Sequence, residues 1–389
     1  MSNLVIHGKH DDQTIEQMRN CLRSPGATHG VICADGHLGY AQPVGGVIAY
    51  KDHISISGVG FDIDCGNMAV KLNIPFSEIA FHVKQIADDI EKNISFGLGR
   101  ANAEKVDHEL FESDAWKYAG VGYLKSLARD QLGTVGSGNH YVDVFEDEAG
   151  MTWIGVHFGS RGLGHKIATQ FLQLAGGKDG MMVDPCVIEA KSDLGQQYIK
   201  AMRLAGDYAY AGREWVVGRV AAIIDADVIK TVHNHHNYAW LEEHDGEEYW
   251  VVRKGATPAF PGQAGFVGGS MGDNAVIIAG VDSPESAKSL YSTVHGAGRL
   301  HGRMVAKGKK NKDGTWKRKP MFTRAQMDEW LEPLGVELRG GDVDESPMVY
   351  RRLNEVLDEH KGTIEVIHTL KPRIVVMANS KRDFDPYKD

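Results

Sequence analysis

Apolar residues recur at helical spacing in several stretches of the chain. Asp12–Leu22 predicts a helix that ends at Ser-Pro-Gly, and residues 187–231 carry Ala, Leu and Ile at a spacing that predicts two long helices. Residues 76–130 are expected to be mostly helical as well. Further helices are expected after Ser-Arg-Gly-Leu-Gly (160–164), near 324–333 and near 347–360.

Other stretches have the composition of strands. Residues 45–73 are rich in β-branched residues and glycine, which predicts strands broken by a tight turn. Residues 243–255 are typical of a hairpin with an Asp-Gly turn. Because strands and helices mix without repeated β-α-β units, we predict an α+β fold, with residues 1–389 forming one domain around a glycine-rich cleft. Further strands are expected at 140–146, 151–157, 275–280 and 363–377.

Composition narrows the class of protein. No stretch reaches the ~18 apolar residues that a membrane helix needs, and the polar start Met1–Gln13 lacks the apolar core of a signal peptide. We therefore expect a cytoplasmic enzyme without a membrane partner. The 4 cysteines are scattered, so neither a disulfide framework nor a zinc ribbon is expected. The 18 histidines matter because histidine is the commonest metal ligand.

The net charge of −9 excludes a general basic coat. A nucleic-acid surface, if present, must therefore be local, because phosphate contacts need clustered Lys and Arg. Residues 307–320 form the dense basic segment of the sequence. This segment fits either a solvated loop or a contact with nucleic-acid phosphates. Residues 379–389 are expected to form a C-terminal tail.

Glycine adjoins chemically active side chains in five short segments. Glycine lets the backbone turn sharply or approach a ligand, and packing alone does not explain five such segments. The segments are GVGFDIDCG (58–66), VGSGNHYVD (135–143), GVHFGSRGLGH (155–165), VHNHHNYAW (232–240) and VHGAGR (294–299).

Five residues in these segments have the chemistry of metal ligands. A thiolate can bridge two ions, and carboxylate and imidazole groups can complete the shells. The alternatives are a buried structural cysteine, a turn aspartate and histidines that serve only as polar core residues. Ligand type alone favours zinc. The candidates are Asp62, Cys65, His140, His157 and His236.

Two short glycine loops, GGSMG (268–272) and HGAG (295–298), could cradle phosphate oxygens with their backbone N–H groups. Neither is a Walker loop or a Rossmann fingerprint. His295 opens the second loop, where it could act as a nucleophile toward a nucleotide phosphate. The alternative is a histidine that merely occupies a turn.

The sequence resembles the RtcB family of RNA ligases over nearly its whole length. The motifs that carry the resemblance occur in the family's order, and we know no other family with this series. They are ADGHLGYAQPVGG (34–46), GVGFDIDCG, GSGNH, HFGSRGLGH, HHNYAWLEEH, RKGATPAFPG, GGSMG and HGAGR.

The resemblance implies a mechanism. Two Mn²⁺ ions would be bridged by Cys65 and completed by the other four candidate ligands, with His236 preferred over His233 and His235 because Asn-Tyr-Ala follows it. His295 would attack the α-phosphate of GTP and carry GMP to an RNA 3′-phosphate, itself formed from a 2′,3′-cyclic phosphate where that end is supplied. An RNA 5′-hydroxyl would then displace GMP, in tRNA splicing or RNA repair. Whether a protein partner activates the enzyme is left open.

The resemblance also implies binding residues. Arg161 matches an arginine that contacts phosphate, and we expect a local positive surface that includes Arg253, Lys254 and Arg299. The positions that match the family's guanylate site are Asn139, Asp143, Asn237, Gly268, Gly269, Ser270, Met271, His295, Gly296, Ala297 and Gly298.

Four positions depart from the family's pattern. Met377 stands where a lysine contacts guanine, Asp143 stands for a glutamate, and Ala275 stands for a serine. Asp64 adds a carboxylate to the motif around Cys65. These changes alter the expected nucleobase pocket but leave the metal ligands and His295 in place.

Two other classes compete with a ligase. One is a metal-dependent phosphoesterase that acts on RNA cyclic-phosphate ends, and the other is a non-catalytic RNA-binding protein. Hydrolysis does not need His295, and binding alone needs neither His295 nor the metal ligands. Their presence together therefore favours nucleotidyl transfer.

Overall fold

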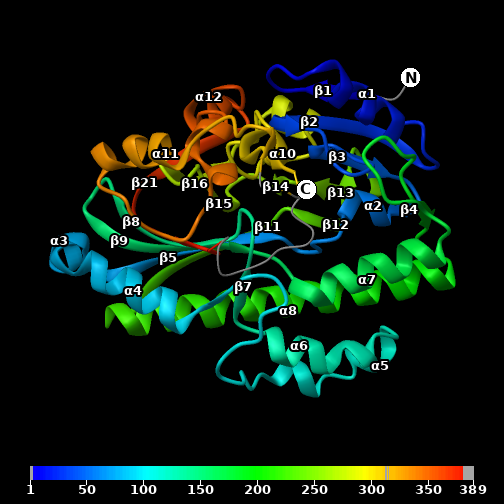
Figure 1. The fold of residues 1–389 in the computed structure, drawn as a ribbon. Coiled ribbons are helices and arrows are strands. Elements are labelled where there is room, and N and C mark those ends of the chain that lie inside the picture. The colour runs from blue at the N-terminus through cyan, green and yellow to red at the C-terminus, as the bar shows by residue number, and fades with distance from the viewer. Residues whose placement is uncertain (1–2, 312, 314, 380–389) are drawn as a thin grey trace.

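A computed structural model describes residues 3–311, 313 and 315–379 of the chain. Two β-sheets form the body, and the helices pack mainly on the outside of it (Figure 1). The helices are α1 (Asp12–Cys21), α2 (Ile56–Val59), α3 (Phe76–Ile79), α4 (Val83–Asn93), α5 (Ala115–Tyr118), α6 (Lys125–Gln131), α7 (Arg161–Leu174), α8 (Asp193–Ile224), α9 (Pro284–Lys288), α10 (Arg303–Lys307), α11 (Arg324–Leu331) and α12 (Leu353–Asp358).

The larger sheet has the order β11-β5-β9-β8-β21-β16-β15, with β20 paired to β21, and the smaller has the order β1-β2-β3-β13-β12. Pairs of short strands complete the structure. The strands are β1 (Asn3–Ile6), β2 (Ala27–His37), β3 (Val44–Tyr50), β4 (His53–Ser55), β5 (Gly66–Pro75), β6 (Ser95–Phe96), β7 (Thr134–Gly136), β8 (Tyr141–Asp147), β9 (Met151–Phe158), β10 (Val187–Glu189), β11 (Val228–His235), β12 (Asn237–His244), β13 (Glu247–Lys254), β14 (Ala256–Pro258), β15 (Ala264–Val267), β16 (Ala275–Gly280), β17 (Ser292–Val294), β18 (Lys309–Lys310), β19 (Trp316–Arg318), β20 (Glu337–Arg339) and β21 (Ile364–Met377).

The edge strands of the larger sheet curl toward each other. Asn234 of β11 accepts a hydrogen bond from the Phe266 N–H of β15 at 2.8 Å, and Asn67 of β5 donates one to the Phe266 carbonyl at 2.8 Å. These side-chain hydrogen bonds connect β11 and β15, which are not paired by backbone hydrogen bonds in the strand order of the sheet. The larger sheet is therefore nearly closed, and strands distant in sequence meet around one space.

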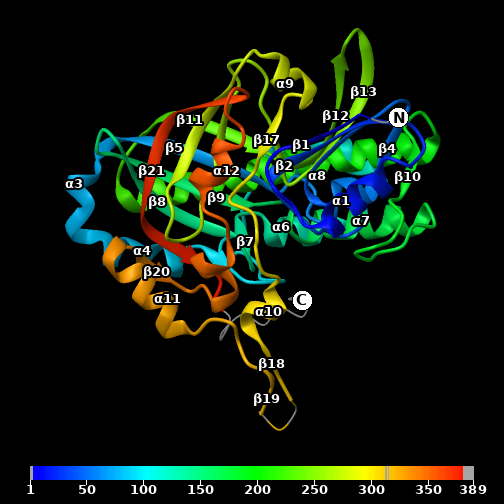
Figure 2. The same cartoon turned by 90° about the horizontal axis from the view of Figure 1, so that it is seen from above.

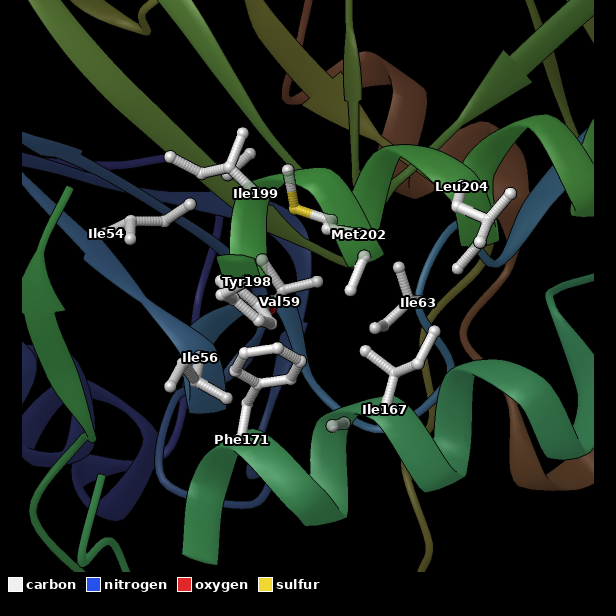
Figure 3. Packing of buried hydrophobic residues seen from close by; sticks show 14 of the residues in the cluster. Ile54, Ile56, Val59, Ile63, Ile167, Phe171, Tyr198, Ile199, Met202 and Leu204 are labelled. Carbon is white, nitrogen blue, oxygen red and sulfur yellow. The ribbon is translucent and has the colours of Figure 1, made fainter. Parts of the chain in front are cut away.

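A hydrophobic core beneath the sheets fixes the segment that leads into the site. Figure 3 shows Ile167 and Phe171 of α7 facing Tyr198 and Met202 of α8, with Val59 packed among them. All five side chains are buried, and each contributes about 1.5–3 kcal/mol by leaving water. This packing anchors the chain immediately before the turn at residues 60–65.

The predicted α+β architecture is confirmed, as are the helix near residues 12–22 and the hairpin around Asp245 and Gly246. The prediction of two long helices over 187–231 is wrong. One helix, α8, spans Asp193–Ile224, and it ends where Asp225 adopts a left-handed conformation (φ 60°). The β-branched residues that follow enter β11 instead of a second helix.

The basic segment at 307–320 was expected to be a loop, but it contains the β18–β19 hairpin, which projects beside α10 (Figure 2). The predicted tail lies outside the described residues apart from Asn379. Within the described part of the chain, no helix is both long and apolar enough to cross a membrane.

Candidate metal and nucleotide site

A tight turn presents Asp62 and Cys65. Gly60 and Asp64 both have positive φ, 86° and 59°, a conformation that Gly, Asn and Asp tolerate best. The Cys65 N–H donates to the Asp62 carbonyl at 3.0 Å, which places both side chains on one side of the turn. The Cys65 carbonyl accepts from the His236 N–H at 2.9 Å, so the turn is joined to the corner between β11 and β12.

Cys65, His140 and His157 form a cluster of metal-ligand atoms. Cys65 Sγ lies 3.7 Å from His140 Nε2 and 3.6 Å from His157 Nε2. The donor atoms of all three lie within 4.8 Å of one another. Asp62 Oδ2 lies 3.1 Å from His140 Nε2. Four donor atoms thus face a small volume, as in the sites that hold transition-metal ions.

Neighbouring groups orient both imidazoles toward this volume. His140 Nδ1 lies 2.9 Å from the Val135 carbonyl, and His157 Nδ1 lies 2.6 Å from Asn67 Oδ1. A proton on each Nδ1 leaves each Nε2 with a lone pair, the usual arrangement behind a metal-bound histidine. Burial, followed by the charges of nearby histidines, lowers the pKa of His157 well below its ordinary value, so the ring is neutral.

The acidic members of the cluster also fit a metal ion. Burial raises the pKa of Asp62, but the His140 hydrogen bond and charge outweigh it and bring the pKa to about 2. Asp62 is therefore a carboxylate. Burial, reinforced by Asp62, raises the pKa of the Cys65 thiol well above its usual range. A cation beside Sγ is what would stabilise the thiolate form there.

His236 extends the cluster toward His295. Its ring stacks on His157 with centroids 5.2 Å apart, and it lies 4.8 Å from the His295 ring. His236 Nδ1 is buried and has no hydrogen-bond partner among the described residues. A metal ion is one partner that such a buried nitrogen can take.

His295 is held by a carboxylate that the sequence analysis did not single out. His295 Nδ1 lies 2.6 Å from Asp35 Oδ2, which also accepts the His295 N–H at 3.1 Å. Burial raises the pKa of Asp35, but the charge and hydrogen bonds of His295 outweigh it, so the pKa is lowered and the carboxyl is ionised. The carboxylate therefore contacts the ring at Nδ1 and not at Nε2.

A cavity of about 930 Å³ joins these groups. All five candidate metal ligands and His295 line it, and so do all the positions that match the guanylate site. Asn237 has a structural task as well, because its side chain accepts from the Gly255 N–H at 2.7 Å and donates to the Asp62 carbonyl at 3.2 Å.

Two of the four departures from the family's pattern, Asp143 and Met377, line the cavity. Asp143 and Val375 are paired across β8 and β21, as are Tyr141 and Met377, and all four line the cavity. Asp143 Oδ1 is buried with no partner among the described residues, and burial raises the pKa of this carboxyl well above its usual range. This part of the cavity therefore presents the apolar side chains of Val375 and Met377 beside a carboxyl whose protonated form is favoured by burial.

The four predicted phosphate or RNA contacts lie in different surroundings. Lys254 lines the cavity, but its Nζ donates to the Tyr40 carbonyl, and burial lowers its pKa to about 8. Arg299 also lines the cavity and donates to Glu345 at 3.2 Å. Arg161 is not part of the lining, but its Nη1 lies 3.3 Å from His140 Nδ1.

Arg253 lies away from the cavity and is fully buried. Its guanidinium donates to Glu242 at 2.6 Å, to Ser292 Oγ at 2.9 Å and to the Leu290 carbonyl at 2.8 Å. These bonds tie β13 to its neighbours and leave Arg253 inaccessible to RNA.

Asp64 does not join the metal cluster, although it lies next to Cys65. It is buried on the opposite side of the turn, where Oδ2 pairs with Arg213 Nη2 at 2.9 Å. Its other oxygen contacts His235 Nδ1, and Arg213 Nε donates to His233 Nε2 at 2.7 Å. His233 and His235 therefore belong to this ion-pair network, whereas His236 faces the cavity.

The sequence analysis missed two polar residues that support the site. Asp35 lies in the Ala-Asp-Gly-His segment, and Asn67 follows the turn that carries Cys65. Both occur inside the quoted motifs or directly after them. Membership of these motifs was therefore a usable signal, but it does not indicate which histidine each residue contacts.

The geometry brings a cluster of metal-type ligand atoms and His295 together in one cavity. The family model described as "tRNA-splicing ligase RtcB" matches residues 17–122 and 122–378 of the chain. The chain therefore belongs to the RtcB family.

Named relatives agree with this assignment. The "RNA-splicing ligase RtcB" of Escherichia coli (strain K12) is 30% identical over 93% of each chain. The "tRNA-splicing ligase RtcB" of Thermococcus kodakarensis is 31% identical over 78% of this chain and 79% of the relative. The "tRNA-splicing ligase RtcB" of Nanoarchaeum equitans is 28% identical over 96% of this chain and 94% of the relative.

Proposed function

We propose that this protein is an RNA ligase that joins an RNA 3′-phosphate end to a 5′-hydroxyl end through a nucleotide carried on His295. The observation that carries the proposal is the position of His295. Its ring lies 4.8 Å from His236, and its Nδ1 lies 2.6 Å from the ionised Asp35. An imidazole that is held at Nδ1 by a carboxylate, beside a metal-type cluster and a glycine loop, is suited to attack a phosphate through Nε2.

Two Mn²⁺ ions are the cations we propose for the cluster, as the family resemblance implies. The residues that would hold them are Asp62, Cys65, His140, His157 and His236. When bound, the ions would withdraw charge from the phosphate oxygens and make phosphorus easier to attack. Val135 and Asn67 keep His140 and His157 oriented for this role.

The first step loads the histidine. The His295 Nε2 lone pair forms a bond to the α-phosphorus of GTP, and the bond from that phosphorus to the bridging oxygen breaks. Pyrophosphate leaves with the bonding electrons. Asp35 stabilises the positive charge that develops on the ring, because its carboxylate lies against Nδ1. The 268–271 and 295–298 loops are proposed to hold the nucleotide phosphates.

The next steps transfer and join. An oxygen of the RNA 3′-phosphate attacks the phosphorus carried on His295, and the P–N bond breaks to free the imidazole. The 5′-hydroxyl of the second end then attacks the 3′-phosphorus, loses its proton and displaces GMP. An end supplied as a 2′,3′-cyclic phosphate is first opened by water, with cleavage of the P–O2′ bond.

A joining assay tests the proposal. Two short RNAs, one with a 3′-phosphate and one with a labelled 5′-hydroxyl end, are incubated with the protein, Mn²⁺ and GTP. A labelled product of summed length, which disappears when GTP or Mn²⁺ is omitted, is the expected result. Opening of a cyclic-phosphate end without joining, in the presence or absence of GTP, would instead identify a phosphoesterase.

A further inference from the structure

A second pocket, of about 460 Å³, opens beside the main cavity. Leu300, Tyr350 and Arg351 line both spaces, so the two share a wall. The volume is within the range of sites that hold small organic ligands. We call this space the side pocket, and its aromatic and arginine side chains are Phe322, Trp330, Tyr350, Arg351 and Arg352.

The shared wall is tied directly to the loop that carries His295. The Leu300 N–H donates to the Val349 carbonyl at 2.8 Å, and Arg299 Nη1 donates to Tyr350 Oη at 2.8 Å. Because only a few residues separate His295 from this pairing, the side pocket has a fixed position relative to the nucleophile.

Arg351 carries an unsatisfied donor at the boundary of the two spaces. Its Nη2 donates to the Gly36 carbonyl at 3.1 Å, but its Nη1 is buried with no hydrogen-bond partner among the described residues. A Cβ placed on Gly298 would lie 2.9 Å from Nη1, so the guanidinium approaches the glycine loop closely. A buried cationic donor without an acceptor is costly, and a phosphate oxygen would satisfy it.

The other side of the side pocket carries aromatic rings beside an arginine. The Arg352 guanidinium lies over Trp330, 4.3 Å from the ring centroid, and its Nη1 is held by Asp273 at 2.5 Å. The Phe322 ring lies 6.1 Å from His301, a residue that lines the main cavity. Aromatic rings interleaved with arginine are the surface on which proteins stack the bases of single strands.

We propose that the side pocket binds one unpaired nucleotide of the RNA strand whose end enters the main cavity. The base stacks on Trp330 and Phe322, and the phosphate next to it binds Arg351 Nη1. This inference rests on the proposed function for the identity of the strand. The side pocket would thus be a binding site for a nucleotide next to the reacting end. The nucleotide must be unpaired, because only an unpaired base can turn outward and stack on aromatic side chains.

The test measures the affinity of single-stranded RNA that ends in a 3′-phosphate, by fluorescence anisotropy. We expect Trp330→Ala and Phe322→Ala each to weaken binding about tenfold, the loss of about 1.4 kcal/mol of stacking. Tyr118→Ala is the control, because Tyr118 is an exposed aromatic residue on α5, far from α11 and α12 (Figure 1). Trp330→Phe should restore most of the affinity, and thermal melting checks that each variant is folded.

A second arm locates the base. RNAs that lack one base at successive positions near the 3′-phosphate should show one position at which wild-type binding falls about tenfold. The same omission should have little effect on Trp330→Ala, because the stacked pair is already lost. Equal effects of every omission on wild type and variant, or wild-type affinity in both aromatic variants, would overturn the inference.

A third arm separates this inference from the proposed function. Covalent labelling by GTP should have the same GTP dependence in Trp330→Ala as in wild type. A raised GTP requirement would place the donor's own base in the side pocket and overturn the inference. If wild type binds RNA through the side pocket but neither labels nor joins, the proposed function fails while the pocket assignment stands.

Discussion

The two sides of the turn at residues 62–65 use the same types of residue in opposite ways. On the cavity side, Asp62 faces His140 and Cys65, and the groups around it lack some of their hydrogen-bond partners. On the other side, Asp64 is closed off by Arg213, which also donates to two backbone carbonyls at 2.9 and 2.6 Å.

The difference separates the candidate metal ligands on the cavity side from the residues on the other side, called here the support side, which hold the turn in place. The support side is a buried ion pair in which Arg213 donates to the Asp64 carboxylate, to two backbone carbonyls and to His233, so its removal should reduce stability. The cavity side holds imidazoles, a thiol and a carboxylate that a cation would satisfy, so its removal should reduce metal binding. Carboxylate and histidine occur on both sides, and only the direction of each side chain assigns its role.

The largest effect is expected on the cavity side. Cys65→Ser should lower manganese affinity at least ~100-fold, because a hydroxyl is a much poorer bridging ligand than a thiolate and even supporting residues cost 10–100-fold. Metal content after dialysis, measured by mass spectrometry, checks this. A variant that keeps its full metal content would remove Cys65 from the ligand set.

The next effect is expected on the support side. Arg213→Ala should destabilise the fold by about 3–5 kcal/mol, because it leaves the Asp64 carboxylate buried without its partner. Urea unfolding monitored by circular dichroism measures the change in the free energy of unfolding. A loss below about 1 kcal/mol, the size typical of an exposed pair, would contradict the account of this network.

A smaller effect is expected for Asn67, which contacts the candidate ligand His157. Asn67→Ala removes the acceptor that orients His157, and should lower metal affinity by about 10–100-fold with the ligands intact. A titration of the variant with manganese measures the change in metal affinity. Because Asn67 also donates to Phe266, urea unfolding of the metal-free variant should accompany it. Unchanged metal affinity in a folded variant would show that Asn67 does not position His157.

The smallest effect is expected for Asp64→Asn. Asparagine tolerates the left-handed backbone there and keeps an acceptor for Arg213, so the variant should lose about 1–3 kcal/mol of stability. Its metal content should match that of wild type, in contrast to Asp62→Asn. Loss of metal from Asp64→Asn but not from Asp62→Asn would reverse the assignment of the two sides.

Much of the fold was predictable from local pattern. The β8 and β9 strands lie close to the predicted ranges 140–146 and 151–157, and the β12–β13 hairpin lies where the Asp-Gly turn predicts it. The errors came from regions where tertiary packing decides. Residues 187–231 were predicted as two helices, whereas α8 is one helix that packs closely at Gly206, where a Cβ would lie 3.3 Å from the Tyr238 ring.

The candidate site was less predictable in its supporting residues. The cavity-lining ligand candidates and His295 lie in glycine-rich segments with an unusual residue content, which made them visible in the sequence. Asp35 contacts His295 across 260 residues of chain, and Arg351 approaches Gly298 from a segment with no recognisable motif. Contacts of this length depend on how the sheets close, which local sequence does not specify.

The most direct test of the account is covalent labelling of His295. Wild-type protein incubated with α-labelled GTP and Mn²⁺ should give a labelled band on a denaturing gel, and mass spectrometry should locate GMP on His295. His295→Ala should give no band while binding as much manganese as wild type. Undiminished labelling of His295→Ala would show that another residue carries the nucleotide and would contradict the proposed mechanism.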